Sequence, residues 1–180
     1  MNDYGTVTAP DTVRIERSLP GPIERVWEYL TDSDKRATWL ASGAMDLRVG
    51  GLVDLRFLNS SLSASDDLPP PKYASHAGET RMAGRITACE PPRLLSYTWG
   101  GESSDDASEV SFELTPRADK VQLVLTHRRL ATRGDMLSVA AGWHAHLGIL
   151  VDTLAGRTPE SFWTTHTRLE AEYGRRIPAE

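Results

Sequence analysis

The stretch GWHAHLGILVDTLAG, residues 142–156, decides the fold. It continues a pattern in which apolar residues recur every three or four positions, which is the period of one helix face. The residues that share this face are Met136, Ala140, Trp143, Leu147, Leu150 and Leu154. Asp135 is placed to cap the start of the helix and Gly156 to end it, whereas Asp152 falls on the opposite, solvent-facing side. The pattern predicts a long amphipathic helix that packs against the rest of the chain.

The same stretch excludes a membrane helix and a helical metal site. Its uninterrupted apolar runs are far shorter than the roughly 18 residues that a bilayer span requires. His144 and His146 are two residues apart, so they lie about 200° apart around a helix and cannot bind one ion together. We therefore predict no metal and no cofactor. His146 lies at the edge of the apolar face, where a hydrogen-bonded boundary histidine is more common than a ligand-binding one.

Before this helix the sequence alternates between apolar and polar residues in a series of short segments, which is typical of strands that are buried on one face. Gly50-Gly51 separates two of these segments and predicts a hairpin turn. Two short helices are expected within residues 22–40, where Pro22 suits a first helical position. The predicted strands are residues 12–19, 45–49, 52–57, 81–89, 94–99, 108–115 and 120–128.

We expect a single domain over residues 12–176 of the 180-residue chain, preceded by a flexible tail at residues 1–11. The segment 59–79 is rich in serine, aspartate and proline and predicts a long loop, either a lid or a disordered segment. After Gly156 a second part of the terminal helix is expected to restart at Pro159.

The composition narrows the function classes. A net charge of −5 without a cluster of Lys and Arg argues against nucleic-acid binding. Cys89 is the only cysteine, which excludes an internal disulfide and favours a cytoplasmic location, and its strand-like setting favours an inert thiol over a nucleophile. No signal peptide is evident at the start of the sequence. Asp66-Asp67 and Asp105-Asp106 are interpreted as solubilising pairs in loops.

An antiparallel sheet with one apolar face must cover that face, and the final helix is the only long amphipathic element. A helix of about 20 residues is roughly 30 Å long, so the sheet has to curl around it. A cavity remains where inward residues such as Gly84 and Ala88 are small, unless Trp99 and Trp143 fill the space. The predicted cavity residues are Trp39, Phe57, Ile86, Tyr97, Trp99, Phe112, Leu125, His127, Trp143, His146, Leu147 and Leu150.

Several strings together resemble a known family. They are RIERSLPGPIERVWEYLTD (14–32), VGGLVDLRF (49–57), GRITACEPPRLLSYTW (84–99), SFELTPRADKVQLVLTH (111–127) and GWHAHLGILVDTLAG (142–156). The chain resembles homologues of the activator of the 90-kDa heat-shock-protein ATPase, within the START-related, polyketide-cyclase-like SRPBCC superfamily. The resemblance implies an α+β helix-grip fold, in which a curved antiparallel sheet of six to seven strands wraps a long C-terminal helix around a hydrophobic cavity.

The resemblance implies three alternative functions. The first is a binding protein for a small apolar or amphipathic molecule, such as a lipid or a polyketide-like compound. The second is an enzyme of cyclase or dehydratase type, with His127 as the candidate general acid or base and His146, Tyr97 and Glu109 after it. The third is an interaction module that acts on a chaperone or another protein. The eukaryotic co-chaperone carries an additional N-terminal domain that has no counterpart here, which does not favour ATPase activation.

Overall fold

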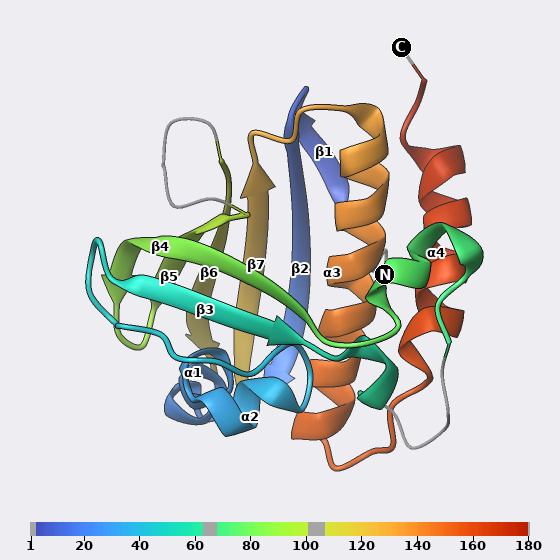
Figure 1. Cartoon of the computed structure of the whole chain (residues 1–180). Helices are drawn as coiled ribbons and strands as arrows, with labels where there is room; N and C mark the ends of the chain where they lie inside the picture. The colour runs from blue at the N-terminus through green and yellow to red at the C-terminus, as the bar shows by residue number, and fades with distance from the viewer. Residues whose placement is uncertain (1–2, 63–67, 101–106, 180) are drawn as a thin grey trace.

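The computed structural model describes residues 3–62, 68–100 and 107–179. Within these residues, seven strands form one antiparallel sheet in the order β1-β2-β7-β6-β5-β4-β3 (Figure 1). The sheet is curved, helix α3 lies against its concave face, and α4 lies beside α3 (Figure 1). The strands are β1 (Thr6–Ala9), β2 (Thr12–Pro20), β3 (Leu52–Phe57), β4 (Thr80–Glu90), β5 (Leu94–Trp99), β6 (Ser108–Arg117) and β7 (Lys120–Arg128). The predicted helix-grip fold is confirmed.

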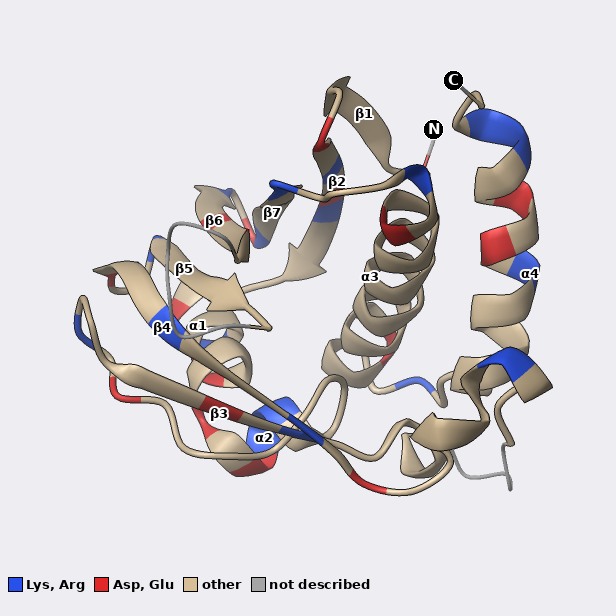
Figure 2. Ribbon diagram, turned by 45° about the horizontal axis from the view of Figure 1, so that its top comes forward, with Lys and Arg blue, Asp and Glu red and all other residues tan. Residues whose placement is uncertain are grey.

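Helix α3 (Arg133–Leu154) carries the apolar face that the sequence predicts. All six residues of that face are buried, and the charged residues of the helix lie near its ends (Figure 2). The predicted cap at Asp135 is wrong by three positions. Thr132 is the N-cap, and its hydroxyl accepts a hydrogen bond of 3.0 Å from the backbone N–H of Asp135. Asp135 lies in the first turn instead, where its negative charge interacts favourably with the helix dipole.

Cross-strand pairs on β6 and β7 supply the apolar layer beneath α3. Val110 pairs with His127, Phe112 with Leu125 and Leu114 with Leu123, and all six side chains are buried. Successive residues of a strand point to opposite faces, so this alternation directs one full row of each strand to the helix. The register places His127 in the same inward row as the leucines and valines.

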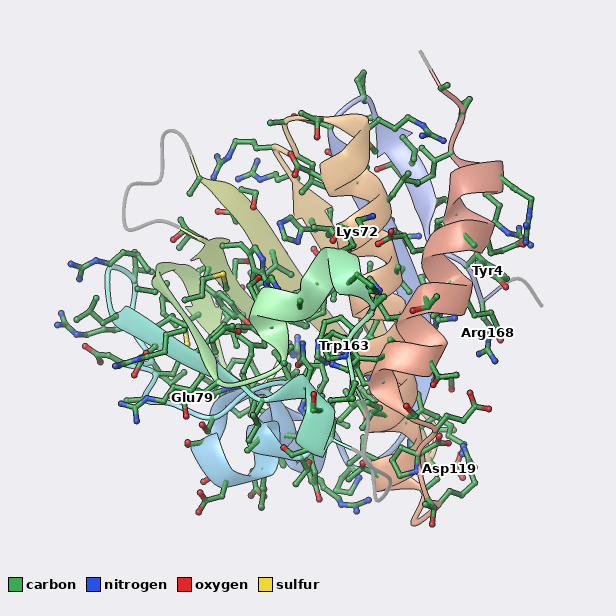
Figure 3. All side chains as sticks on the ribbon, turned by 45° about the vertical axis from the view of Figure 1, so that its right-hand side comes forward. Tyr4, Lys72, Glu79, Asp119, Trp163 and Arg168 are labelled. Atoms are coloured by element: carbon green, nitrogen blue, oxygen red, sulfur yellow. The ribbon has the colours of Figure 1, made fainter. Side chains whose placement is uncertain are left out.

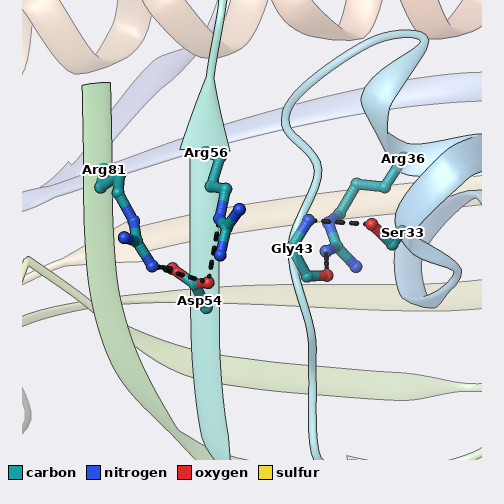
Figure 4. A network of polar contacts seen from close by, with 6 residues as sticks. All are labelled: Ser33, Arg36, Gly43, Asp54, Arg56 and Arg81. Carbon is teal, nitrogen blue, oxygen red and sulfur yellow. Dashed lines mark hydrogen bonds and ion pairs between the residues drawn. The ribbon is translucent and has the colours of Figure 1, made fainter. Parts of the chain in front are cut away.

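Two short helices, α1 (Ile23–Thr31) and α2 (Ser33–Ala37), follow β2 as predicted. The buried side chain of Arg36 fixes the segment that leads from α2 to β3. Its guanidinium donates hydrogen bonds to the carbonyls of Ala41, Thr31 and Gly43, and Gly43 in turn donates to Ser33 (Figure 4). These carbonyls compensate the cost of burying a charged group.

Three local predictions are wrong. Residues 6–9 of the expected tail form β1, because Val7 pairs with Val13 at the edge of the sheet. Residues 45–49 do not form a full strand. A single bridge joins Met45 to Val53, and Met45 packs against the core, but the next two residues of the apolar row, Leu47 and Val49, remain exposed. The second terminal helix, α4 (Phe162–Arg176), begins after Ser161 rather than at Pro159.

The segment that follows β3 crosses from the sheet to the terminal helices. It contains two 3-10 turns, η1 (Asn59–Ser61) and η2 (Pro71–His76), in the part of the segment that the structure describes. The η2 turn lies against α3 and α4, where the Tyr73 hydroxyl contacts Ser138 and Glu170 (Figure 1). Of the two alternatives for residues 59–79, the described part therefore fits a lid.

Candidate functional site

A cavity of about 340 Å³ lies between α3, the start of α4 and the adjoining ends of β3, β4 and β5, with η1 and η2 over it. The void exists because the curved sheet and the straight helix separate at this end, as the sequence predicts for a sheet wrapped around a cylinder. Six of its sixteen lining residues are Phe, Tyr or Trp. They are Phe57, Tyr73, Trp99, Trp143, Phe162 and Trp163.

These rings contact one another in two groups on opposite sides of the cavity. On the sheet side, Trp99 lies 4.9 Å from Trp143 and 5.8 Å from Phe57 between ring centroids. On the α4 side, Trp163 stacks on Tyr73 at 5.6 Å and meets Phe162 edge-on at 5.0 Å. Edge-on and offset contacts of this kind hold the rings in fixed orientations. These contacts restrict the rotamers of the aromatic side chains in the wall.

Trp143 is held in place by a buried chain of hydrogen bonds. Its indole N–H donates to Nδ1 of His127 at 2.9 Å, and Nε2 of His127 lies 2.8 Å from the Ser108 hydroxyl. Burial lowers the pKa of His127 to about 3, so the ring is neutral and its proton is on Nε2, which donates to Ser108. The Ser108 hydroxyl donates in turn to the Trp99 carbonyl at 3.3 Å. The chain orients Trp143 and ties it to the Trp99 backbone.

His127 is therefore a positioning residue. The sequence predicted that His127 lies on the inward face of its strand, and it does. The sequence also made His127 the candidate general acid or base of the cavity. Both ring nitrogens are hydrogen-bonded, to Trp143 and to Ser108, and His127 is not among the residues that line the cavity, which favours a positioning role. A base needs a free nitrogen that reaches the substrate.

His146 does line the cavity. Its Nδ1 lies 2.8 Å from the Trp39 carbonyl, and burial lowers its pKa to about 4. His144, two residues earlier, faces away from the cavity, and its Nδ1 lies 2.9 Å from the Tyr173 hydroxyl. The prediction that His144 and His146 point to different sides of the helix is confirmed. The predicted hydrogen bond of His146 at the edge of the apolar face is confirmed as well.

His166, on α4, is the second buried histidine in the cavity wall. Its Nδ1 has no hydrogen-bond partner among the described residues and lies 4.0 Å from a carboxylate oxygen of Glu170. Burial lowers the pKa of His166, although the Glu170 charge opposes this shift. Burial alone would raise the pKa of Glu170, but hydrogen bonds from Lys72 and Tyr73 hold it below its usual range.

Lys72 and Tyr73 hold the η2 turn over the cavity. The Tyr73 hydroxyl donates to Glu170 and lies 3.3 Å from the Ser138 hydroxyl, and Lys72 forms an ion pair with Glu170. Figure 3 shows the η2 segment that carries Lys72 next to Trp163. At the sheet side of the opening, Arg81 is held by Asp54, 3.2 Å away (Figure 4). Tyr73 thus links the lid to both terminal helices.

Of the predicted cavity residues, Phe57, Trp99, Trp143 and His146 line the cavity. The other eight are fully or almost fully buried and pack in the core instead. They are Trp39, Ile86, Tyr97, Phe112, Leu125, His127, Leu147 and Leu150. All of them are on inward faces, but the space near them is filled.

Two further candidates lie outside the cavity wall. Glu109 pairs with Arg128, its cross-strand neighbour, at 2.6 Å, and its position on β6 alternates with the inward Val110. Tyr97 is enclosed, and burial raises its pKa, so it neither reaches the cavity nor ionises readily. Gly84 does not leave a void either, because a Cβ there would lie 2.2 Å from the Thr98 carbonyl oxygen. Its small size permits close approach of β4 to β5.

The sequence interpretation missed the α4 and lid side of the cavity. Tyr73, His76, Phe162, Trp163 and His166 all line it. An aromatic residue inside the proline-rich segment and the Phe162-Trp163 pair at the start of a helix were the available signals, since exposed loops rarely carry large aromatic residues. The missing information was the contact between two segments about 90 residues apart.

Several other predictions concern residues elsewhere. Cys89 is partly buried, and burial raises the pKa of its thiol. Asp66-Asp67 and Asp105-Asp106 lie outside the described residues. Across residues 3–62, 68–100 and 107–179, no cluster of three or more His, Cys, Asp or Glu side chains is arranged to bind a metal ion. In the same ranges, no helix has the length and apolar character needed to cross a membrane.

Comparison with known proteins places the chain among relatives of the same fold. A model of the family described as activator of Hsp90 ATPase homolog 1-like protein matches residues 20–155. A protein of Bordetella parapertussis, solved by NMR in solution, is 44% identical, with 99% of this chain and 93% of that chain aligned and a TM-score of 0.81. A comparison with curated proteins found no match.

Two more distant structures share the fold. The crystal structure of CalU16 from Micromonospora echinospora is 21% identical, with 93% of this chain and 89% of that chain aligned and a TM-score of 0.67. DynU16, a protein of the dynemicin biosynthetic locus, is also 21% identical, with 84% of this chain but 49% of that chain aligned and a TM-score of 0.64.

Proposed function

The chain belongs to the family of activator of Hsp90 ATPase homolog 1-like proteins, and on that premise we propose that it binds a small, mostly apolar aromatic molecule in the cavity beside α3. The family fold supports ligand binding in general. The choice of ligand class rests on the residues of this chain, because one fold accommodates many functions.

The observation that carries the proposal is the aromatic lining of the cavity. A volume of about 340 Å³ falls at the lower end of the roughly 300–1,000 Å³ typical of small-molecule sites. Six aromatic rings form the wall, and the chain from Trp143 through His127 to Ser108 fixes one of them. Rigid walls lower the entropic cost of binding because few side chains have to be ordered.

The test uses two bicyclic probes, 2-naphthol and 2-methylnaphthalene, titrated into the purified protein by isothermal titration calorimetry. We expect one binding site per chain and a negative heat-capacity change, which accompanies burial of apolar surface. Native mass spectrometry of the freshly purified protein then identifies any ligand that remains bound. If neither probe binds up to its solubility limit and no ligand co-purifies, the proposal is wrong.

One observation favours the cyclase or dehydratase alternative. His166 lines the cavity with an unpartnered Nδ1, and Glu170 behind it is held in its charged form by Lys72 and Tyr73. The negative charge of a nearby carboxylate raises the pKa of a histidine and makes it a better base. This alternative predicts that a co-purifying ligand loses one water on incubation with fresh protein and that His166→Gln stops the loss without weakening binding. A ligand that stays unchanged over days contradicts it.

A further inference from the structure

The tautomer of His146 is determined by its contact with the segment that follows α2. Nδ1 lies 2.8 Å from the backbone carbonyl of Trp39. A carbonyl oxygen only accepts hydrogen bonds, so the proton of the ring must be on Nδ1. The other nitrogen, Nε2, therefore presents a lone pair and acts only as an acceptor.

The ring remains in this neutral form over the physiological range. It is almost fully buried, and burial lowers its pKa to about 4, far below neutral pH. His166 lies near enough to oppose a second positive charge. At pH 7 nearly every molecule thus carries the same neutral tautomer.

Among the described residues, the hydrogen bond found for the His146 ring is the one between Nδ1 and Trp39, and none is found at Nε2. The neighbouring rings are apolar, with Phe162 at 4.5 Å, Trp143 at 6.2 Å and Phe57 at 6.4 Å between centroids. The indole N–H of Trp143 is bonded to His127, and the Tyr73 hydroxyl is bonded to Glu170. Both of these donors are engaged elsewhere, which leaves the acceptor of His146 for a molecule in the cavity.

His166 differs in this respect. Burial lowers its pKa, whereas the Glu170 charge and a backbone hydrogen bond at Ser138 raise it. The bond at Ser138 requires the proton of the neutral ring on the nitrogen that makes that bond, so the unpartnered Nδ1 carries a lone pair and lies 4.0 Å from the Glu170 carboxylate. A carboxylate lies beside the acceptor of His166 and repels an acceptor group of a ligand, whereas His146 is surrounded by the rings of Phe162, Trp143 and Phe57.

We propose that His146 determines the specificity of the cavity, accepting through Nε2 a hydrogen bond from a hydroxyl or N–H group on the bound aromatic molecule. The inference rests on the proposed function and narrows it to aromatic compounds that carry a donor, such as phenols. A site built around a buried acceptor rejects analogues that lack the donor, because the acceptor then loses its partner.

The experiment compares 2-naphthol with 2-methylnaphthalene, which has nearly the same shape but a methyl group in place of the hydroxyl. Calorimetry gives the ratio of their dissociation constants in the wild type, in His146→Phe and in His146→Asn. The Asn side chain retains an N–H for the Trp39 carbonyl but is too short to place an acceptor where Nε2 is. The control is His144→Asn, because His144 is on the same helix but faces Tyr173.

We expect either change at His146 to reduce the preference for 2-naphthol over 2-methylnaphthalene by about tenfold or more, the effect of one buried hydrogen bond. His144→Asn should leave the preference unchanged. If both His146 variants keep the wild-type preference, the assignment of His146 is wrong while the cavity remains a binding site. If neither probe binds the wild type, the proposed function fails and the inference fails with it.

Discussion

The sharpest prediction concerns Gly142, a glycine of α3 that lines the cavity. A Cβ at this position would meet no atom within 4 Å, so a larger side chain can extend into the open space. Gly142→Leu adds four carbon atoms. If each takes about the 30 Å³ that a water molecule occupies in the liquid, they fill roughly a third of the cavity volume of about 340 Å³.

The variant should be more stable than the wild type and yet lose binding. Replacing a helical glycine gains about 0.5–1 kcal/mol in helix propensity, and burying part of the leucine adds about 1 kcal/mol or more. We therefore expect the free energy of unfolding to rise by about 1–2 kcal/mol. The dissociation constant of 2-naphthol should rise at least about tenfold, because accommodating the probe would now require overpacking.

Gly148→Leu is the matched control. Gly148 is also in α3, and a Cβ there would likewise meet no atom within 4 Å, but it faces a separate hollow beside Asp152 and Arg168. This variant should gain the same helix propensity and bind 2-naphthol normally. Urea denaturation and calorimetry measure both quantities. A destabilised Gly142→Leu protein, or one that binds the probe as well as the wild type, would refute the position of the cavity.

Three further predictions test the surroundings of the cavity. His127→Phe removes the acceptor of the Trp143 N–H, and we expect a loss of about 1–3 kcal/mol in urea denaturation together with weaker probe binding. Tyr73→Phe removes the hydroxyl that bonds Glu170, so the amides of residues 72–76 should exchange with deuterium faster and the probe should dissociate faster. The pKa of His146 falls from 6.5 in the unfolded chain to about 4 on folding, so the unfolded state binds more protons between these values and stability falls as pH drops through this window. Removing this histidine in His146→Asn should make the stability loss between pH 7 and pH 4.5 smaller by about 2 kcal/mol, as measured by denaturation at each pH. Equal losses in the two proteins would show that the ring is not buried in its neutral form.

The elements of the fold could be predicted from the sequence because their patterns are local. The three-to-four-residue spacing from Met136 to Leu154 indicated the long helix, and the alternation in residues 108–128 indicated the inward rows of β6 and β7. Ends of elements were less certain. The predicted N-cap of α3 was Asp135, whereas the observed N-cap is Thr132. Both residue types cap helices, and only the backbone conformation distinguishes them.

The candidate site could be predicted on one side only. Trp99, Trp143 and His146 follow from the inward rows of β5 and α3, where alternation and helical spacing apply. Tyr73 and Trp163 do not, because their contact depends on how an irregular segment folds back onto α4. The core residues predicted as cavity lining point the right way, but the sequence does not show where facing side chains meet and where they leave space.

The role of His127 shows the same limit. Its position on an inward row suggested a catalytic group, and that row is correct. Its hydrogen bonds to Trp143 and Ser108 depend on the register of β6 and β7 and on the rotation of α3. Those contacts are between distant parts of the chain, and they convert a candidate base into a support for the cavity wall.

If a small aromatic molecule binds in the space beside α3, NMR can locate it directly. Intermolecular nuclear Overhauser effects between bound 2-naphthol and the protein should connect the probe to the indole rings of Trp99, Trp143 and Trp163, which line the cavity. Trp27 and Trp39 lie outside the wall and should show none. Contacts to Trp27 alone, or none to the three cavity tryptophans when the probe is saturating, would contradict the account.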